Sequence, residues 1–192
     1  MRKVDAARLV LVQVAEQEDP HDGLVADWVA STAWSCAGFR IDEVYPSAWL
    51  RARQEPAAIP GVLADAVLRI AGADAVVIVV ASCASGRLQG LDALVDAVGE
   101  HLRGKPVAFV YSSEHAAMRC DRAIERIRAR LAAACLDADV RFPPQGPRSD
   151  ARGCPQPDSS EAHALRCMFT RLLDRVGVRR GTGALDSCRA VA

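Results

Sequence analysis

The feature that most constrains the fold is the apolar run from Ala75 to Ala81 (AVVIVVA), which no polar residue interrupts. Its β-branched residues favour a strand, and its length is that of one strand. A strand without polar alternation has to be covered on both faces, which is typical of the centre of a parallel sheet. We therefore predict that this run is the central strand of a sheet that lies between two layers of helices.

Other segments alternate between strand and helix patterns along the chain. Strand patterns occur at Arg8–Ala15, at Phe39–Tyr45 nearer an edge, at Val107–Tyr111 and at Ala138–Phe142. Helical patterns run from Leu24 to Cys36, from Ile59 to Gly72, from Leu91 to Leu102, from Ser112 or Ser113 to Cys135, and from Ser159 to Val176. This order implies right-handed crossovers, and so predicts an α/β three-layer sandwich with a five-stranded parallel sheet.

One domain is expected to account for the whole chain, residues 1–192. Its length and its 51% hydrophobic and 25% charged residues are ordinary for a globular domain. Residues 143–157 contain five prolines and two glycines, which predicts an exposed loop. Residues 177–192 show no pattern and are expected to form a tail.

Composition argues against several classes of protein. Lys+Arg and Asp+Glu balance at 24 each, whereas a broad nucleic-acid surface needs a basic excess. No segment approaches the roughly 18 apolar residues of a membrane span, and no signal peptide is recognisable, so we expect a cytoplasmic protein. The seven cysteines form no C-x-x-C pair, so neither a disulfide framework nor a metal site is expected.

A small-molecule site, if present, is expected in three loops. In doubly wound sheets, ligands bind beyond the carboxyl ends of the strands, near the point where the strand order reverses. The loops that meet this condition are Glu16–Gly23, Ser82–Gly90 and Ser112–His115. No nucleophile elbow, Walker motif or G-x-G-x-x-G supports a hydrolase or a nucleotide-binding P-loop protein.

Three pieces of sequence together resemble the NADPH-dependent FMN reductase family. They are GADAVVIVVA at Gly72–Ala81, the loop that ends at Leu88–Gly90, and LRGKPVAFV at Leu102–Val110. The match is good over residues 72 to 115. The resemblance implies a flavodoxin-like fold, a homodimer, and non-covalently bound FMN that receives hydride from NAD(P)H.

The resemblance also implies where FMN binds. The flavin would lie across Ser82–Gly86 and Ser112–His115, and its phosphate near His21–Leu24. The cofactor-binding residues expected are His21, Gly23, Ser82, Cys83, Ser85, Gly86, Ser112, Ser113 and His115. No catalytic residue is assigned, because in such enzymes the flavin carries the redox chemistry.

Two features of the loops favour an alternative. The first loop contains Glu16, Glu18, Asp19 and Asp22 but no Ser, Thr, Arg or Lys, and the loop after Ala81 has no aromatic residue. The alternative is a flavodoxin-like domain that has lost flavin and acts as a protein-interaction module. An enzyme that uses the same pocket for another ligand is a third hypothesis, since a fold does not fix chemistry.

Cysteines and histidines outside those loops are expected to be structural. Cys36, Cys120, Cys135 and Cys167 occur in helical patterns and are predicted to pack in the core. His101 and His163 are predicted to be ordinary surface residues of helices.

Overall fold

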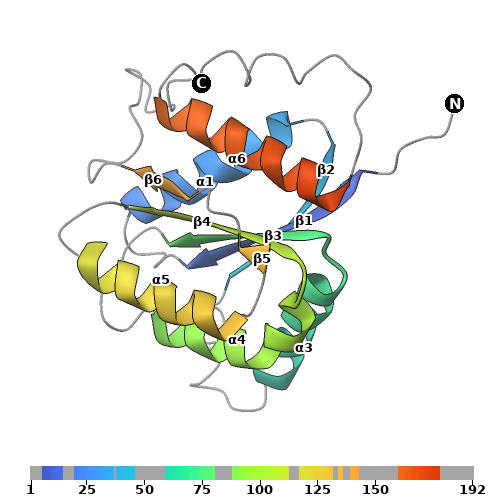
Figure 1. The fold of residues 1–192 in the computed structure, drawn as a ribbon. Coiled ribbons are helices and arrows are strands. Elements are labelled where there is room, and N and C mark those ends of the chain that lie inside the picture. Colours follow the sequence, from blue (N-terminus) through green and yellow to red (C-terminus); the bar gives the residue numbers. More distant parts are fainter. Residues whose placement is uncertain are drawn as a thin grey trace, which may run out of the picture.

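A parallel β-sheet with helices on both faces organises the chain (Figure 1). The residues that this computed structural model describes are 6–14, 20–36, 38–45, 59–80, 88–112, 117–131, 134–135, 139–142 and 160–177. The predicted proline-rich loop at 143–157 and the predicted tail beyond Gly177 lie outside the described residues.

The elements alternate as the sequence predicts. The strands are β1 (Ala7–Val14), β2 (Phe39–Val44), β3 (Ala75–Val80), β4 (Pro106–Ser112), β5 (Ala134–Cys135) and β6 (Val140–Phe142). The helices are α1 (Pro20–Ser35), α3 (Ile59–Ala71), α4 (Leu88–Leu102), α5 (Ala117–Leu131) and α6 (Ser160–Val176).

The strand order is β2-β1-β3-β4-β5, and every described pairing is parallel. After β1, the chain adds β2 on one side of it and then adds β3, β4 and β5 on the other side. The strand order therefore reverses between β1 and β3. β3 occupies the centre and β2 an edge, which confirms both predictions. The predicted α/β architecture with five strand positions is also confirmed.

The fifth strand position is shared by two short strands, a division that the sequence analysis did not predict. β5 pairs with the start of β4, and β6 pairs with its end. On β4, the two pairings are three residues apart, at Val107 and Val110. Their partners on the outer side, Cys135 and Val140, are five residues apart in the sequence. Two extra residues thus interrupt the outer strand, as a bulge does.

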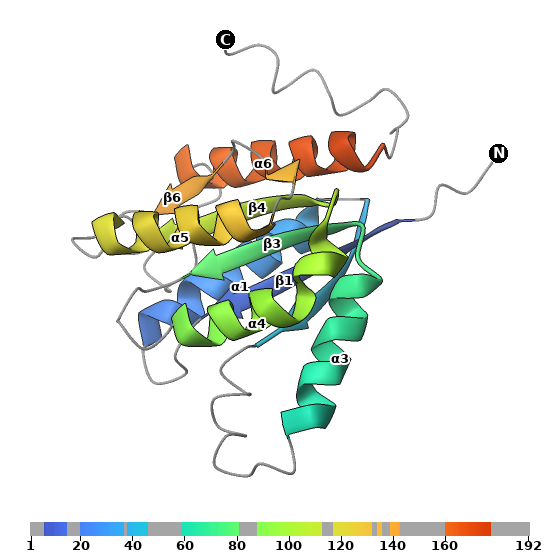
Figure 2. The ribbon, with the colours of Figure 1, turned by 60° about the horizontal axis from the view of Figure 1, so that its bottom comes forward.

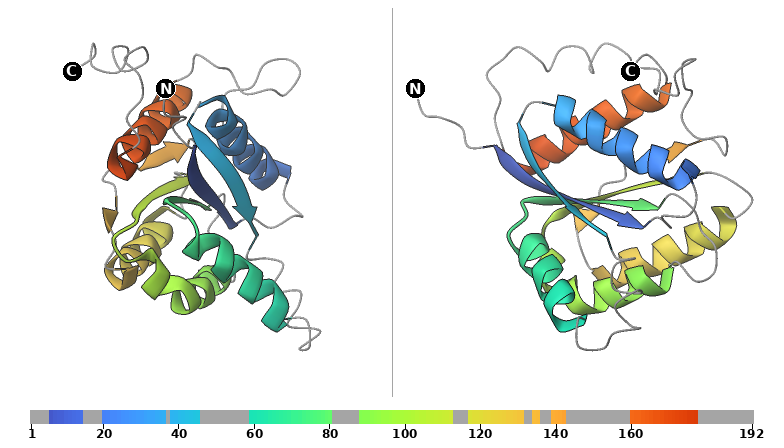
Figure 3. Two further views of the ribbon diagram at one scale, coloured as in Figure 1. Left: turned by 90° about the vertical axis from the view of Figure 1, so that its right-hand side faces the viewer. Right: turned by 180° about the vertical axis from the view of Figure 1, so that it is seen from behind.

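Two helical layers bury the sheet. α1 and α6 cover one face, and α3, α4 and α5 cover the other (Figures 2 and 3). Successive residues of β3 face the two layers alternately, and all of them are at most 1% exposed. This burial explains why the sequence of β3 has no polar alternation.

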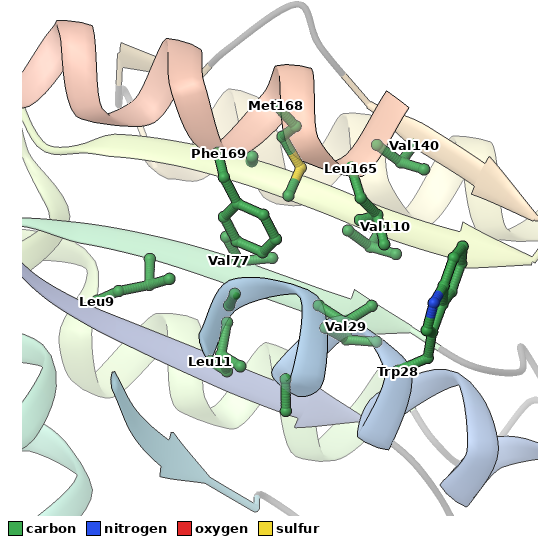
Figure 4. Packing of buried hydrophobic residues seen from close by; sticks show 14 of the residues in the cluster. Leu9, Leu11, Trp28, Val29, Val77, Val110, Val140, Leu165, Met168 and Phe169 are labelled. Carbon is green, nitrogen blue, oxygen red and sulfur yellow. The ribbon is translucent and has the colours of Figure 1, made fainter. Parts of the chain in front are cut away.

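Aromatic contacts join the helices of one layer to the sheet. Figure 4 shows Met168 and Phe169 of α6 projecting toward the strands. On α1, Trp28 meets Phe142 of β6 edge to face, with ring centroids 4.9 Å apart. Phe169 makes a similar contact with Phe39 of β2, at 6.1 Å. The outermost strands β2 and β6 are therefore both tied into the same core.

Two helices begin earlier than predicted. α1 starts at Pro20 rather than Leu24, and α4 starts at Leu88 rather than Leu91. The polar sequence before Leu24 suggested a loop, but proline is well suited to the first helical position, where its missing N–H costs nothing. The predicted loop Glu16–Gly23 therefore contributes its last four residues to a helix.

The predicted helix from Ser112 or Ser113 to Cys135 is wrong at its C-terminal end and for a start at Ser112, while Ser113 lies outside the described residues. Ser112 does not cap a helix, because it ends β4 and pairs with Phe142. α5 stops at Leu131, and Cys135 belongs to β5. In both places the pairing of distant strands prevails over a local helical pattern.

Asp74 fixes the alignment of β1 with β3 at the amino edge of the sheet. Its carboxylate accepts a hydrogen bond from the backbone N–H of Arg8, at 2.7 Å. Its own N–H donates to the carbonyl of Arg8, at 2.8 Å. A Cβ on the neighbouring Gly72 would approach the Arg8 guanidinium to 2.9 Å, so glycine leaves room for that side chain.

Replacing Asp74 should test this role. We expect Asp74→Ala to lower the free energy of unfolding by about 1 kcal/mol, because the Arg8 N–H loses a charged acceptor. Urea denaturation measures the change. Asp65→Ala is the matched control: Asp65 pairs with Arg69 on an exposed helix face, and the change should stay within about 0.5 kcal/mol. Equal effects in the two variants would contradict the assignment.

Lys105, in the turn before β4, caps the C-terminal end of α3. Its ammonium donates to the carbonyls of Ile70 and Ala71, at 2.9 and 2.6 Å, and these belong to the last turn of the helix. A cation at this end also opposes the negative end of the helix dipole. Burial lowers the pKa of Lys105, and the nearby Asp74 carboxylate acts in the opposite direction. Gly104, with φ of +72°, provides the left-handed turn that precedes it.

We predict that Lys105→Met destabilises the fold by about 1–2 kcal/mol, because two helix-terminal carbonyls lose their donor. Thermal and urea unfolding give the value. Arg103→Met is the control, since Arg103 pairs with Glu100 where both side chains are at least 67% exposed. Its loss should cost no more than about 0.5 kcal/mol. A Lys105→Met protein as stable as the control would show that the capping contacts contribute nothing.

Candidate functional site

The carboxyl edge of the sheet gathers the ends of three strands and the starts of three helices. β1, β3 and β4 end at Val14, Val80 and Ser112, and α1, α4 and α5 begin from the same edge, on the left of Figure 1. The reversal of strand order between β1 and β3 lies within this edge. In open α/β sheets this is where ligands bind.

The start of α1 supplies backbone donors for an anion. The first N–H groups of a helix have no partner within the helix, and the helix dipole adds positive potential there. Pro20 has no N–H, so the donors of this turn come from His21, Asp22 and Gly23. A phosphate fits such a helix end. The start of α1 therefore offers backbone donors of the kind that bind anions.

The structure describes three of the nine predicted cofactor-binding residues. His21 and Gly23 lie in the first turn of α1, and Ser112 is the last residue of β4. The topology brings these three to one edge of the sheet. Ser82, Cys83, Ser85, Gly86, Ser113 and His115 lie outside the described residues.

A polar cluster that the sequence analysis missed lies beside this edge, between β1 and β2. Gln13 is only 3% exposed, and its side-chain amide donates to the Glu43 carboxylate at 3.0 Å. The Tyr45 hydroxyl donates to the same carboxylate oxygen. The sequence feature that could have indicated the cluster is Gln13, a polar residue in a mostly apolar strand. A buried polar side chain almost always has a hydrogen-bond partner.

The cluster makes Tyr45 a poor acid. Burial, the hydrogen bond to Glu43 and the negative charges of Glu43 and Asp27 raise the pKa of Tyr45 to about 12. A phenol with this pKa keeps its proton at neutral pH. Glu43 is thereby held by two donors, so the cluster supports the end of β2 rather than supplying an acid or base for chemistry.

The raised pKa of Tyr45 predicts a loss of stability at high pH. An unfolded chain releases this proton near the ordinary pKa of 10, before the folded chain does at about 12. Stability should therefore fall as the pH rises through this interval. We expect Tyr45→Phe to reduce the fall, measured as the difference in unfolding free energy between about pH 9 and pH 11. The same fall in both proteins would contradict the cluster's role.

Arg141 places a positive charge at the end of β4. Its Nε donates to the Tyr111 hydroxyl at 2.8 Å, and its guanidinium carbon lies 5.4 Å from the centre of that ring. Tyr111 is 2% exposed and immediately precedes Ser112. The Arg141 guanidinium is thus held against Tyr111, and the Asp139 carboxylate interacts electrostatically with it.

Within the described ranges, no three His, Cys, Asp or Glu side chains gather as ligands of one metal ion. Among the described helices, none combines the length and apolar character that crossing a bilayer requires.

Comparison with known proteins rests on structure. No family model matches this sequence, and no curated protein matches it significantly. The structure resembles the apo form of an NADH:FMN oxidoreductase, with a TM-score of 0.62 and 12% identity over 93% of this chain and 92% of that one. It also resembles the flavoenzyme NAD(P)H:(acceptor) oxidoreductase of Paracoccus denitrificans, with a TM-score of 0.61 and 13% identity over 90% and 98%.

A flavodoxin from Megasphaera elsdenii matches over 85% of this chain and 98% of its own, with a TM-score of 0.51 and 12% identity. The strand order of this chain is also that of flavodoxin. The fold is flavodoxin-like. This likeness agrees with the resemblance found in the sequence, at the level of the fold.

Proposed function

We propose that this flavodoxin-like chain is a flavoprotein oxidoreductase that binds FMN and transfers hydride to it from NAD(P)H. The observation that carries the proposal is the likeness to the NADH:FMN oxidoreductase and to the Paracoccus flavoenzyme, each over at least 90% of this chain. The carboxyl edge at the β1–β3 reversal provides a place for the cofactor.

The described residues fit the phosphate end of FMN. Backbone N–H groups of His21, Asp22 and Gly23 would bind the phosphate at the start of α1. FMN, when bound, supplies the redox chemistry, and the protein binds and orients it. We further propose that Ser82–Gly86 and Ser112–His115 contact the flavin.

An absorbance spectrum of the purified protein and a titration with FMN test the proposal. We expect bands near ~450 nm, or saturable FMN binding, and bleaching on addition of NADH or NADPH. Riboflavin, which lacks the phosphate, should bind at least about tenfold more weakly, since each phosphate hydrogen bond is charge-assisted. A protein that ignores FMN at high concentration would overturn the proposal and favour a protein-interaction module.

Asp22 tests the position of the phosphate. Because Asp22 lies in the first turn of α1, its charge should oppose a phosphate bound there. We expect Asp22→Asn to tighten FMN binding by about threefold to tenfold and to leave riboflavin binding unchanged. Asp27→Asn, on the same helix but beyond the first turn, is the control and should change neither. Equal effects on FMN and riboflavin would place the phosphate elsewhere.

The cytoplasmic location and the homodimeric state predicted from the sequence belong to the same proposal. Light scattering of the purified protein, with and without FMN, measures the mass of the particle in solution. A monomer under both conditions would contradict the proposed homodimer, but it would not contradict the proposed flavin chemistry.

A further inference from the structure

A histidine and a cysteine lie side by side on α6, on the face turned away from the residues that this helix buries against the sheet. His163 Nε2 and Cys167 Sγ, one helical turn from each other, form a hydrogen-bond contact at 3.5 Å. His163 is exposed and Cys167 half-buried. The residues that α6 buries against the sheet lie on its other side: Ala162, Leu165, Met168, Phe169, Leu172 and Leu173. Cys167 is thus half-buried and is not among the residues that α6 buries against the sheet.

The separation of the two atoms suits one tetrahedral metal ion. Zinc binds cysteine sulfur at about 2.3 Å and histidine nitrogen at about 2.0–2.1 Å, which at a tetrahedral angle puts the two ligand atoms about 3.6 Å apart. The observed 3.5 Å is within about 0.1 Å of this value. Residues four apart on a helix share a face, so the helix itself holds the pair in place.

We propose that His163 and Cys167 form a two-ligand surface site for a thiophilic divalent cation of the Zn²⁺ class. A thiolate and an imidazole together favour zinc over the oxygen-preferring cations Mg²⁺ and Ca²⁺. The metal replaces the thiol proton, which passes to solvent, and the neutral imidazole donates its lone pair, so no oxidant or reductant is required. Two coordination positions remain for water or for ligands from another molecule.

The site is separate from the proposed flavin site in both position and chemistry. Its ligands come from α6 alone, and neither of them is among the residues that α6 buries against the sheet. None of the residues expected to contact FMN contributes to it. Failure of the flavin proposal would therefore leave this one standing, and the reverse holds too.

Titration of the full chain with Co²⁺ tests the site, because cobalt bound to thiolate gives a charge-transfer band in the near ultraviolet. We expect the band to saturate and to disappear when Zn²⁺ is added. Cys167→Ser should remove the Cys167 contribution to the band, and His163→Ala should weaken Co²⁺ binding by at least about tenfold. Neither position is among the residues that α6 buries against the sheet, and circular dichroism verifies that each variant is folded.

The chain offers matched controls. Cys36→Ser removes a half-buried thiol that packs against the core, and His101→Ala removes an exposed histidine of α4. Neither should change the Co²⁺ band or the affinity. The proposal is overturned if the wild-type protein gives no thiolate band, if Cys167→Ser retains the full band, or if His163→Ala binds Co²⁺ as tightly as the wild type.

Discussion

The burial of β3 on both faces is the constraint on which the rest of the structure depends. A strand that is at most 1% exposed at every residue requires a neighbour on each side and a helical layer above and below. Parallel neighbours in turn require helical crossovers, and these bring the carboxyl ends of β1, β3 and β4 to one edge. The candidate site is therefore a consequence of how the sheet is covered.

The residues that carried the family resemblance proved to be determinants of the fold. Asp74 aligns β3 with β1, and Lys105, one of only two lysines against 22 arginines, closes α3. Both lie at the amino edge of the sheet, opposite the edge proposed to bind the cofactor. This is why the resemblance predicted the architecture well and says little about the ligand.

Local patterns were sufficient for most of the fold, because β1 and β3 are nearly continuous apolar runs that are buried, and α6 buries apolar residues at helical spacing. They failed where distant segments decide the structure. Ser112 looks like a helix cap until its pairing with Phe142 is known, and Cys135 fits a helix until it pairs with Val107. The Gln13, Glu43 and Tyr45 cluster likewise joins two strands, and no local pattern predicts the partners of a buried glutamine.

The interruption of the fifth strand has a consequence for how copies of this chain can meet. An open sheet ends in two rows of backbone groups that can pair with another chain, and short or irregular edge strands prevent such growth. Within the described residues, one border is formed by β5 and β6, two short strands that are offset along β4. The other border is β2, which carries the charged residues Arg40, Asp42 and Glu43. Pairing another strand with β2 would bury these charges, and removing charge from water costs free energy. Both described borders thus carry features that disfavour the pairing of this sheet with a second one edge to edge.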